Sequence, residues 1–402
     1  MRILKFSGAD DVGKLMRDIG VDPYGVKIML PKAISCLIHL SAISNIAANI
    51  LKQEMLSLGG DVAVARGALT GKNKTTSCLI IGQSQQIFSL IQKIRVQPFG
   101  LHRLADDLDD NIKKYTRNSF VVPLRKGALN LNGKTYIMGA INLTPDSFSG
   151  DGLYSIKSND YSSLALRRAQ EMLKDGADII DLGGESSRPG ARRISVKEEL
   201  QRVLPVIRKL AKNITAPISI DTTKAEVAVA AIDCGAQIVN DISGLRDKRM
   251  LKVVAKYKAA VVIMHMLGNP MNMQKKILYK SLIGDIILWL KNAVDSAEGA
   301  GINADKIIID PGIGFGKKPE QNLELIKKLE EFRILGKPIL IGPCRKSFIG
   351  KVLKTGPKER TFGTLATCVL AVERGANIVR VHDIKEVSQG LRMAAAIRGI
   401  YA

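Results

Sequence analysis

The chain has 402 residues, enough for two domains or for one large domain with an extension. Its 46% hydrophobic and 24% charged residues are ordinary for a globular protein with a sizeable core, and its single tryptophan argues against a nucleic-acid surface built on stacking. The 60 lysines and arginines give a net charge of +22, but they are spread along the chain, so we interpret them as solvated surface rather than as a patch that binds nucleic acid or a membrane.

The cysteines and the first residues indicate a reducing compartment. The five cysteines are odd in number and show no C-x-x-C spacing, which argues against a disulfide framework and against a structural zinc site. The first residues, MRILKFSGADD, lack the apolar stretch of a signal peptide, and no apolar run reaches membrane-spanning length. We therefore expect a cytoplasmic protein.

Residues 1–130 are expected to form a small α+β domain. They carry no recognisable chemistry, and the stretch GALTGKN at residues 67–73 lacks the length and the Ser or Thr of a phosphate-binding loop. His39 and His102 lie in apolar surroundings and are interpreted as structural. The periodicity predicts a long helical segment at 31–60, strands at 61–69 and 75–82, and helices at 85–94 and 101–115.

A second domain is expected over residues 131–402, with the boundary near 124–134. Eight short apolar runs alternate there with segments of helical periodicity, and near-continuous apolar runs indicate strands buried on both faces. Eight strand–helix units in roughly 270 residues favour a (β/α)8 TIM barrel over a doubly wound open sheet. The runs are residues 135–142, 177–184, 216–222, 236–242, 259–266, 306–314, 337–343 and 377–383.

Nearly every predicted strand ends in a polar side chain. A single Asp or Asn before a helix is usually a capping residue. The carboxyl ends of the strands of a TIM barrel, however, form its active site, so eight such endings predict a site. The residues are Asn142, Glu185 with Arg188, Asp221, Asn240 with Asp241, His265, Asp310, Lys346, and Arg380 with His382.

Three of these side chains suit a flat heterocycle. Asp221, Asn240 and Asp310 supply acceptors and one amide. They match the ring N–H groups of a pterin or a guanine-like edge, because each unmade bond there would leave a buried polar group unpaired.

The cations predict a phosphate or diphosphate at the other end of the ligand. Arg188, Lys346, Arg380 and His382 follow the second, seventh and eighth strands, and the loops after strands seven and eight are the frequent phosphate site of this fold. Asn142 is a candidate ligand for a Mg²⁺ that keeps most of its waters and bridges phosphate oxygens.

Other signals carry less weight. The sequence contains no apparent Ser-His-Asp or Cys-His arrangement and no two-His metal pair. GIGFGK at residues 312–317 is explained as a loop after a strand, and Cys344 as a small, partly buried hydrophobe. His265 is compatible equally with packing inside the barrel and with lining a pocket.

The motifs together resemble the dihydropteroate synthase family. They occur in the family's order, cover roughly residues 130–400 and are highly specific as a set. They are MGAINLTPDSFSGDG (138–152), DLGGESSRPGA (181–191), SIDTTK (219–224), VNDISG (239–244), MHMLGNPMNMQ (264–274), DPGIGFGK (310–317), GPCRKSFIG (342–350) and VRVHD (379–383). The resemblance implies an enzyme that joins (7,8-dihydropterin-6-yl)methyl diphosphate to 4-aminobenzoate, giving dihydropteroate and diphosphate for folate synthesis.

The resemblance also implies roles for single residues. Asn142 is expected to contact magnesium and diphosphate, and Phe315 to form the apolar wall of the aminobenzoate pocket. The pterin readers are then Asp221, Asn240, Asp310 and Lys346, and the diphosphate-binding pair is Arg380 and His382, with Arg380 also lying against the ring. These two and Lys346 are the expected catalytic residues. Ser187 and Arg188 fall on a mobile second loop, and Asp146 and Phe148 on the first.

Three positions depart from the family's pattern. The first loop reads SFSGDG where SFSDGG is commoner, which leaves open whether Asp151 takes the place of the family's loop aspartate. Ser187 stands where threonine is usual and keeps the hydroxyl. Cys344 stands where serine is usual, which changes a weak hydrogen bond.

Two rival functions differ in what they require. A methyltetrahydrofolate-dependent corrinoid methyltransferase resembles the family in fold and pterin readers but needs no diphosphate site, so the SSRPG, CRKS and RVHD elements argue against it. A basic nucleic-acid-binding protein would show salt-sensitive binding but leaves the polar strand ends without a reason. We expect small-molecule substrates, no nucleic-acid or membrane partner, and a homodimer.

Overall fold

The structure is a computed structural model, and it describes residues 1–4, 8–70, 74–144, 161–188 and 190–399. The chain divides into two compact units, Met1–Lys113 and Lys114–Ala402. No helix in the described ranges is both long enough and apolar enough to cross a membrane.

The second unit is a barrel of eight parallel strands, which confirms the predicted (β/α)8 fold. Its sheet has the order β11-β10-β9-β8-β7-β6-β13-β12. A single bridge between Ile309 and Ile339 joins the two ends of this order. The strands are β6 Tyr136–Asn142, β7 Ile179–Gly183, β8 Ile218–Asp221, β9 Ile238–Asp241, β10 Ala260–Met264, β11 Ile307–Asp310, β12 Leu340–Ile341 and β13 Ile378–Val381.

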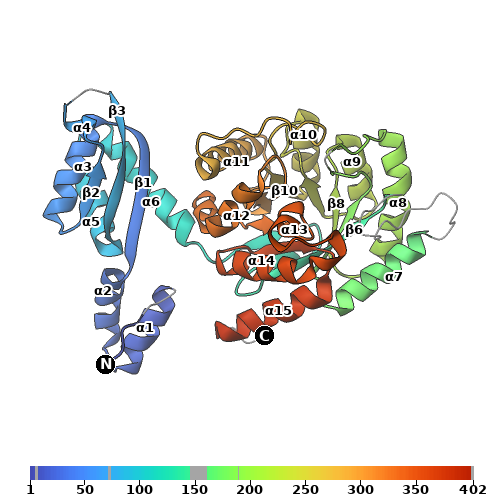
Figure 1. The fold of residues 1–402 in the computed structure, drawn as a ribbon, viewed down its shortest axis with the longest axis horizontal. Helices are drawn as coiled ribbons and strands as arrows, with labels where there is room; N and C mark the ends of the chain where they lie inside the picture. The colour runs from blue at the N-terminus through green and yellow to red at the C-terminus, as the bar shows by residue number, and fades with distance from the viewer. Residues whose placement is uncertain (5–7, 71–73, 145–160, 189, 400–402) are drawn as a thin grey trace. The chain divides into compact units, whose positions relative to one another are not determined.

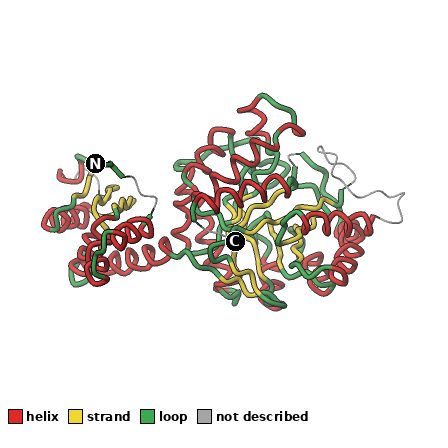
Figure 2. Tube along the Cα trace, turned by 90° about the horizontal axis from the view of Figure 1, so that it is seen from below, coloured by secondary structure: helices red, strands yellow, loops and turns green. Residues whose placement is uncertain are grey.

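Helices surround the barrel strands (Figures 1 and 2). α8 shows why these segments are helical: the hydroxyl of Ser195 accepts a hydrogen bond from the Glu198 backbone at 3.1 Å, and Val203, Ile207 and Leu210 share its buried face. The α-helices are α7 Tyr161–Lys174, α8 Val196–Asn213, α9 Ala225–Asp233, α10 Lys248–Tyr257, α11 Leu282–Gly299, α12 Pro319–Lys327, α13 Ser347–Leu353, α14 Thr361–Glu373 and α15 Ile384–Ile397. Short 3₁₀ helices cover Ala304–Lys306, Leu329–Leu335 and Pro357–Glu359.

A hairpin closes the amino-terminal end of the barrel. It consists of β4 Val121–Pro123 and β5 Ala128–Asn130, which pair in antiparallel fashion. Its apolar side chains, Phe120, Val122, Leu124, Leu129 and Leu131, share one cluster with Met138, Ile179, Ile238, Ala260, Val262, Ile308, Leu340 and Ile378 of the barrel strands. The sequence suggested a boundary at 130/131, whereas the contacts divide the chain at Lys113–Lys114, because the hairpin packs into the barrel core.

The first unit contains a three-stranded antiparallel sheet with the order β1-β3-β2. Its core includes Leu51 and Met55 of α3 and Leu90 and Ile94 of α5. The strands are β1 Ser35–Ser44, β2 Asp61–Val64 and β3 Thr75–Gln83. The helices are α1 Ala9–Asp18, α2 Pro23–Ala33, α3 Asn45–Ser57, α4 Gly67–Thr70, α5 Ser84–Ile94 and α6 Leu101–Thr116, the last of which runs into the second unit.

The prediction of one helical segment over residues 31–60 is wrong. That stretch contains the end of α2, the whole of β1 and then α3. Cys36, Ile38 and Leu40 alternate with more exposed residues, as in a strand with one buried face. His39 therefore lies on a strand, paired with Leu79 of β3.

Candidate active site

The ends of the strands bring the predicted polar residues to one rim of the barrel. Asn142 and Asp221 are the last residues of β6 and β8, and Asp310 is the last residue of β11. Asn240 lies beside Asp221 in the register of β8 and β9. The parallel order of the strands thus gathers side chains that are far apart in the sequence.

Arg380 of β13 lies between two carboxylates inside the barrel. Its Nε donates to Asp181 Oδ2 at 2.7 Å, and one terminal nitrogen donates to Asp221 Oδ2 at 3.0 Å. Asp181 is fully buried and also accepts a hydrogen bond from Asn240 Nδ2 at 3.3 Å. One interior carboxylate therefore orients two of the predicted ligand-binding side chains.

The electrostatics of this group follow from burial and from opposite charge. The pKa of Asp221 is raised to about 7, mainly by burial; Arg380 opposes this shift and the neighbouring Asp181 adds to it. Burial alone would lower the pKa of Arg380, but Asp181 and Asp221 raise it above its usual range. Arg380 is therefore a permanent cation, whereas Asp221 titrates near neutral pH.

Asp310 begins a loop whose backbone lies against the barrel. Its Oδ1 accepts a hydrogen bond from the Gly312 backbone at 2.7 Å, and burial raises the pKa of Asp310 to about 6. Gly312 has a φ of +73°, and a Cβ there would lie 1.9 Å from the carbonyl oxygen of His265. Only glycine fits this position.

The buried side chain of Lys317 binds the backbone of the same loop. Lys317 Nζ donates to the carbonyl oxygens of Gly312 at 2.9 Å and Phe315 at 3.1 Å, and it lies 3.0 Å from His265 Nδ1. Burial lowers the pKa of Lys317 to about 7 and that of His265 to about 2. His265 is neutral and packs edge-on against Trp289, with ring centroids 5.1 Å apart.

Lys346 and Phe315 meet across the loops after β12 and β11. The ammonium nitrogen of Lys346 lies 4.1 Å from the centroid of the Phe315 ring, a cation–π contact. The pKa of Lys346 is lowered to about 8, mainly by burial and in addition by the positive charge of Arg380.

Asn142 and His382 also lie together. Asn142 Nδ2 and His382 Nε2 are 3.0 Å apart, and the His382 backbone donates to Cys344 Sγ at 3.3 Å. Among the described residues no group of three or more His, Cys, Asp and Glu side chains could hold a metal ion. A metal here would take one amide oxygen from Asn142 and its remaining ligands from water and substrate.

Two cavities open at this rim and share Glu185, Ser186, Ser187 and Asp221. The larger holds about 520 Å³, and its lining includes Asn142, Arg188, Phe315, Arg345, Lys346, Ser347, Arg360, Arg380 and His382. The smaller holds about 340 Å³, and its lining includes Ile242, Arg246, Asp247, Met266 and Pro270. Cations therefore dominate the charged lining of the larger cavity.

Comparison with known proteins identifies the family. The family described as pterin binding enzyme matches residues 138–382. A dihydropteroate synthase of Synechocystis is 46% identical over 280 residues, which are 69% of this chain and 94% of that protein. A solved structure of the Yersinia pestis dihydropteroate synthase with a sulfonamide drug is 39% identical, with a TM-score of 0.66, and covers 70% of this chain and 100% of that one. The chain belongs to the dihydropteroate synthase family.

One relative extends the match into the first unit. A probable bifunctional folylpolyglutamate synthase/dihydropteroate synthase of Halobacterium salinarum is 37% identical over 389 residues, which are 97% of this chain and 46% of that protein. The first unit is therefore shared with a member of the dihydropteroate synthase family.

The structure places the predicted site residues in three ways. Asn142, Ser187, Arg188, Asp221, Phe315, Lys346, Arg380 and His382 line the larger cavity. Asn240 and Asp310, which are 3% and 6% exposed, are buried beside Asp221 and Lys346 and line neither of the two described cavities. The first-loop positions Asp146, Phe148 and Asp151 lie outside the described residues.

Sequence reasoning missed three residues of the site. Asp181 interrupts an otherwise apolar strand, and such an acid inside a buried run was a signal that could have found it. Lys317 ends the DPGIGFGK motif. Arg345, which lines the larger cavity, pairs with the buried Asp383 through its Nε at 3.0 Å. Cys344, expected as a partly buried hydrophobe, also makes polar contacts, with its Sγ 3.6 Å from Asp383 Oδ2.

Proposed function

We propose that this chain condenses (7,8-dihydropterin-6-yl)methyl diphosphate with 4-aminobenzoate, producing 7,8-dihydropteroate and diphosphate. The observation that carries the proposal is the meeting of Asp221 with Arg380, Lys346 and His382 in one 520 Å³ cavity of a dihydropteroate synthase fold. A cavity of this size holds a small organic ligand. Its charges suit a substrate that joins a polar ring to a polyanion.

The pterin ring would bind through Asp221, Asn240 and Asp310, supported by Lys346. Ionised carboxylates accept hydrogen bonds from ring N–H groups, and the Asn240 amide can both donate and accept. Because these groups are buried, each bond that a wrong ring failed to make would leave a polar group unpaired. This cost provides the selectivity for a pterin.

The reaction breaks a C–O bond and forms a C–N bond. The diphosphate leaves with the bonding electron pair, and the pterin methylene becomes a resonance-stabilised cation. Arg380 and His382 would stabilise the negative charge that develops on the diphosphate, and Asp221 and Asp310 the cation. The amine nitrogen of aminobenzoate then attacks the methylene carbon and loses a proton. Water must be excluded, because it would hydrolyse the cation.

We further propose that Asn142 is the protein ligand of a Mg²⁺ bound with the diphosphate. The amide oxygen of Asn142 suits this hard cation, and one protein ligand is enough for an ion that keeps most of its waters. When bound, Mg²⁺ supplies positive charge to the phosphate oxygens. His382, 3.0 Å from the Asn142 amide nitrogen, orients this side chain.

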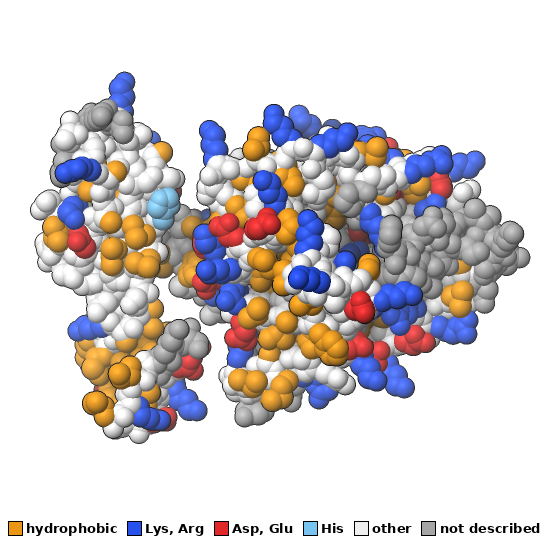
Figure 3. All heavy atoms as spheres, viewed as in Figure 1, with side chains coloured by type: hydrophobic (Ala, Val, Ile, Leu, Met, Phe, Trp, Pro, Cys, Tyr) orange, Lys and Arg blue, Asp and Glu red, His pale blue; other side chains and the backbone are white. Residues whose placement is uncertain are grey.

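We also propose that the chain forms a homodimer through α13, α14 and α15. Exposed apolar side chains gather on this face of the barrel (Figure 3). They are Val352, Leu353, Phe362, Leu370, Met393 and Ile397, with Phe362 81% exposed. Large exposed apolar patches mark interaction surfaces. Phe362→Glu should give a monomer in analytical ultracentrifugation, whereas the same change at exposed Val96 should leave the dimer intact, and a dimeric Phe362→Glu protein would contradict this interface.

The proposed compartment is a reducing cytoplasm. All five cysteines are free, and Cys78 and Cys368 are buried. Cytosolic proteins keep their thiols reduced.

The function is tested by diphosphate release with both substrates present. Release should require 4-aminobenzoate as well as the pterin diphosphate and should yield dihydropteroate in equal amount. Asp310→Asn, which replaces an acceptor by a group that also donates, should lower the activity strongly, and Asp305→Asn, an exposed acid, should not. Release that is no faster with aminobenzoate than without it would contradict the assignment.

A further inference from the structure

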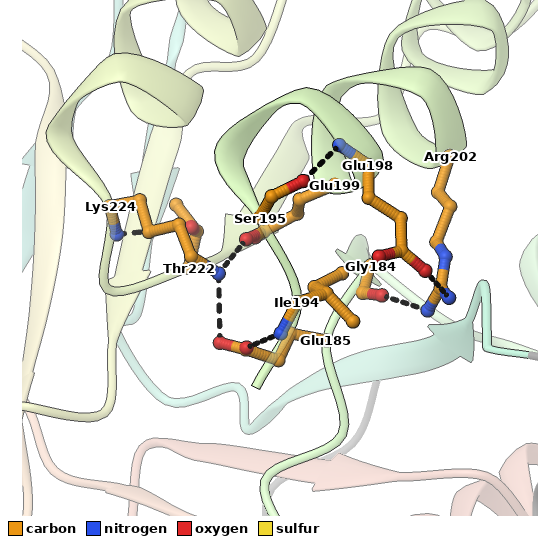
Figure 4. A network of polar contacts seen from close by, with 9 residues as sticks. All are labelled: Gly184, Glu185, Ile194, Ser195, Glu198, Glu199, Arg202, Thr222 and Lys224. Carbon is orange, nitrogen blue, oxygen red and sulfur yellow. Dashed lines mark hydrogen bonds and ion pairs between the residues drawn. The ribbon is translucent and has the colours of Figure 1, made fainter. Parts of the chain in front are cut away.

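One carboxylate joins both ends of the loop between β7 and α8 (Figure 4). Glu185 lies where this loop begins, and its Oε1 accepts a hydrogen bond from the backbone nitrogen of Ile194, where the loop ends, at 2.8 Å. Its Oε2 accepts from Lys224 Nζ at 3.0 Å. Lys224 comes from the neighbouring strand–helix unit, between β8 and α9. The loop is thus tied to itself and to the next loop of the barrel.

A second carboxylate fixes the lysine. Lys224 Nζ lies 2.5 Å from Oε2 of Glu199, a fully buried residue of α8. The other oxygen of Glu199 has no hydrogen-bond partner among the described residues, so Lys224 supplies its neutralising charge. The side chains of Lys224 and Glu185 are 18% and 20% exposed, so that salt screens this group less than a surface ion pair.

The loop start rests on the first turns of α8. Arg202, which is buried, donates to the carbonyl oxygen of Gly184 at 2.9 Å and to Glu198 Oε1 at 2.6 Å. A Cβ at Gly184 would lie 2.7 Å from Val203 Cγ1, which shows how closely the backbone approaches the helix. The direction in which the loop leaves β7 is therefore set by contacts at its base.

The far part of the loop carries site residues. Between its ends lie Ser187 and Arg188, which line the larger cavity. At its tip, the Gly190 backbone nitrogen lies 3.4 Å from the carbonyl oxygen of Pro270, a long hydrogen bond. The base of the loop, where the chain direction is set, therefore helps to place Ser187 and Arg188.

We propose that Glu185, Lys224 and Glu199 form a clasp that positions Ser187 and Arg188 for the second substrate, 4-aminobenzoate. The three are positioning residues, because their charged atoms bind one another and the loop backbone. This inference rests on the proposed function, and it adds residues that set the affinity for one substrate without reacting. Losing the clasp should weaken aminobenzoate binding while the pterin readers on β8, β9 and β11 stay in place.

The test is Lys224→Met compared with Lys328→Met. The control makes the same substitution at Lys328, which directly follows the outer helix α12 and forms an exposed ion pair with Glu324 of that helix. In Lys224→Met, amide hydrogen exchange over residues 186–194 should be faster by about tenfold or more, because the loop base opens locally. The KM for aminobenzoate should rise about tenfold, with kcat and the Kd for the pterin within about twofold. Lys224→Arg, which keeps the charge, should restore most of the affinity.

A second variant guards against a general folding defect. Lys224→Met leaves the buried Glu199 carboxylate without its counter-charge, which could unfold the protein. The double variant Lys224→Met/Glu199→Gln also removes the negative charge of Glu199. If the single variant unfolds, the same measurements on the double variant decide the question. Unchanged exchange over residues 186–194 would overturn the clasp, as would faster exchange with an unchanged KM. Equal rises in the KM for both substrates would also overturn it. The exchange measurement needs no activity, so a failure of the proposed function would be recognised separately.

Discussion

At the scale of single residues, the site is a balance of charges held inside the barrel. Arg380 faces Asp181 and Asp221 at 2.7 and 3.0 Å, while Asp310 and Lys346 lie within electrostatic range of it. Burial raises the pKa values of Asp221 and Asp310, toward the protonated form, and lowers the pKa of Lys346, toward its neutral form. The site therefore contains groups that titrate near neutral pH.

Pterin binding should release protons below neutral pH. The pKa of Asp221 is about 7 and that of Asp310 about 6, and a ring that donates N–H groups favours the ionised form of both and lowers these pKa values. Below about pH 7 binding therefore expels protons, and above about pH 8, where both groups are already ionised, release should vanish.

Calorimetric titration with 6-hydroxymethylpterin, in buffers of different ionisation heat, measures this proton release. Asp221→Asn should remove its share of the released protons and strongly weaken the binding. Release that does not depend on pH would show that these carboxyl groups do not meet the ring.

Asp181→Asn should disorder the Arg380 side chain, although Asp181 itself lines neither cavity. Arg380 Nε and Asn240 Nδ2 both donate to Asp181 Oδ2, and the oxygen of a neutral amide at this position would hold the Arg380 guanidinium less strongly than the carboxylate does. We expect kcat to fall about tenfold or more, since misplaced groups lose much of their catalytic effect. Because Asp181 raises the pKa of Asp221, the acidic limb of the pH–rate profile should also move to lower pH.

The control for Asp181→Asn is Asp178→Asn. Asp178 precedes the same strand at its opposite end, where it pairs with Lys134 at 2.5 Å. An equal fall in kcat for both variants, without a shift of the pH–rate profile, would mean that Asp181 serves only the fold.

At the scale of elements, buried strands were easier to predict than the irregular parts around them. The eight apolar runs correctly indicated the barrel strands, although only Leu340 and Ile341 of the run at 337–343 form β12. Residues 35–44 were misread as helix. Cys36, Ile38 and Leu40 alternate with more exposed residues, as in a strand, but this alternating pattern is short and lies between two segments with helical periodicity. The polar strand ends pointed to the rim, but the Glu185–Lys224 contact depends on loop geometry that no sequence period encodes.

The sequence did not indicate that the hairpin β4–β5 belongs to the core of the barrel. Its side chains fill the amino-terminal end of the barrel, where Leu129 is 1% exposed. Leu129→Ala should lower the free energy of unfolding of the barrel by about 2–5 kcal/mol, through lost burial and the cavity left behind. Val121→Ala, at a 45% exposed position of the same hairpin, should cost far less.

Urea denaturation of the two hairpin variants measures the difference. A chain that begins after the hairpin, at residue 132, should be insoluble or unfolded. If it folds as well as a chain that begins at Lys114, the hairpin is only a surface addition.

At the scale of the whole molecule, the second unit contains the candidate active site. The Synechocystis relative matches 280 residues of this chain over 94% of its own length, so a member of the family consists almost entirely of the barrel. Every described residue of the two cavities also lies between Asn142 and His382.

The isolated second unit, residues 114–402, should therefore be an active enzyme. We expect kcat and both KM values within about twofold of the full chain, because its core and both cavities are built from its own residues. Steady-state kinetics with each substrate varied in turn provides the measurement. A folded but inactive fragment would show that Met1–Lys113 contributes to the reaction.

The single bridge that closes the barrel has a mechanical consequence for the ligand. The circle of strands is joined between β11 and β12 by one backbone pairing, Ile309 with Ile339, next to the two-residue strand β12. Asp310 stands on one side of this seam and Lys346 on the other. A pterin bound by both side chains, as proposed, would span this seam and hold its two sides together. Substrate binding would then stabilise the barrel at this seam, and a mutation that weakens the pairing of β11 with β12 should weaken substrate binding without changing any residue proposed to contact the ring.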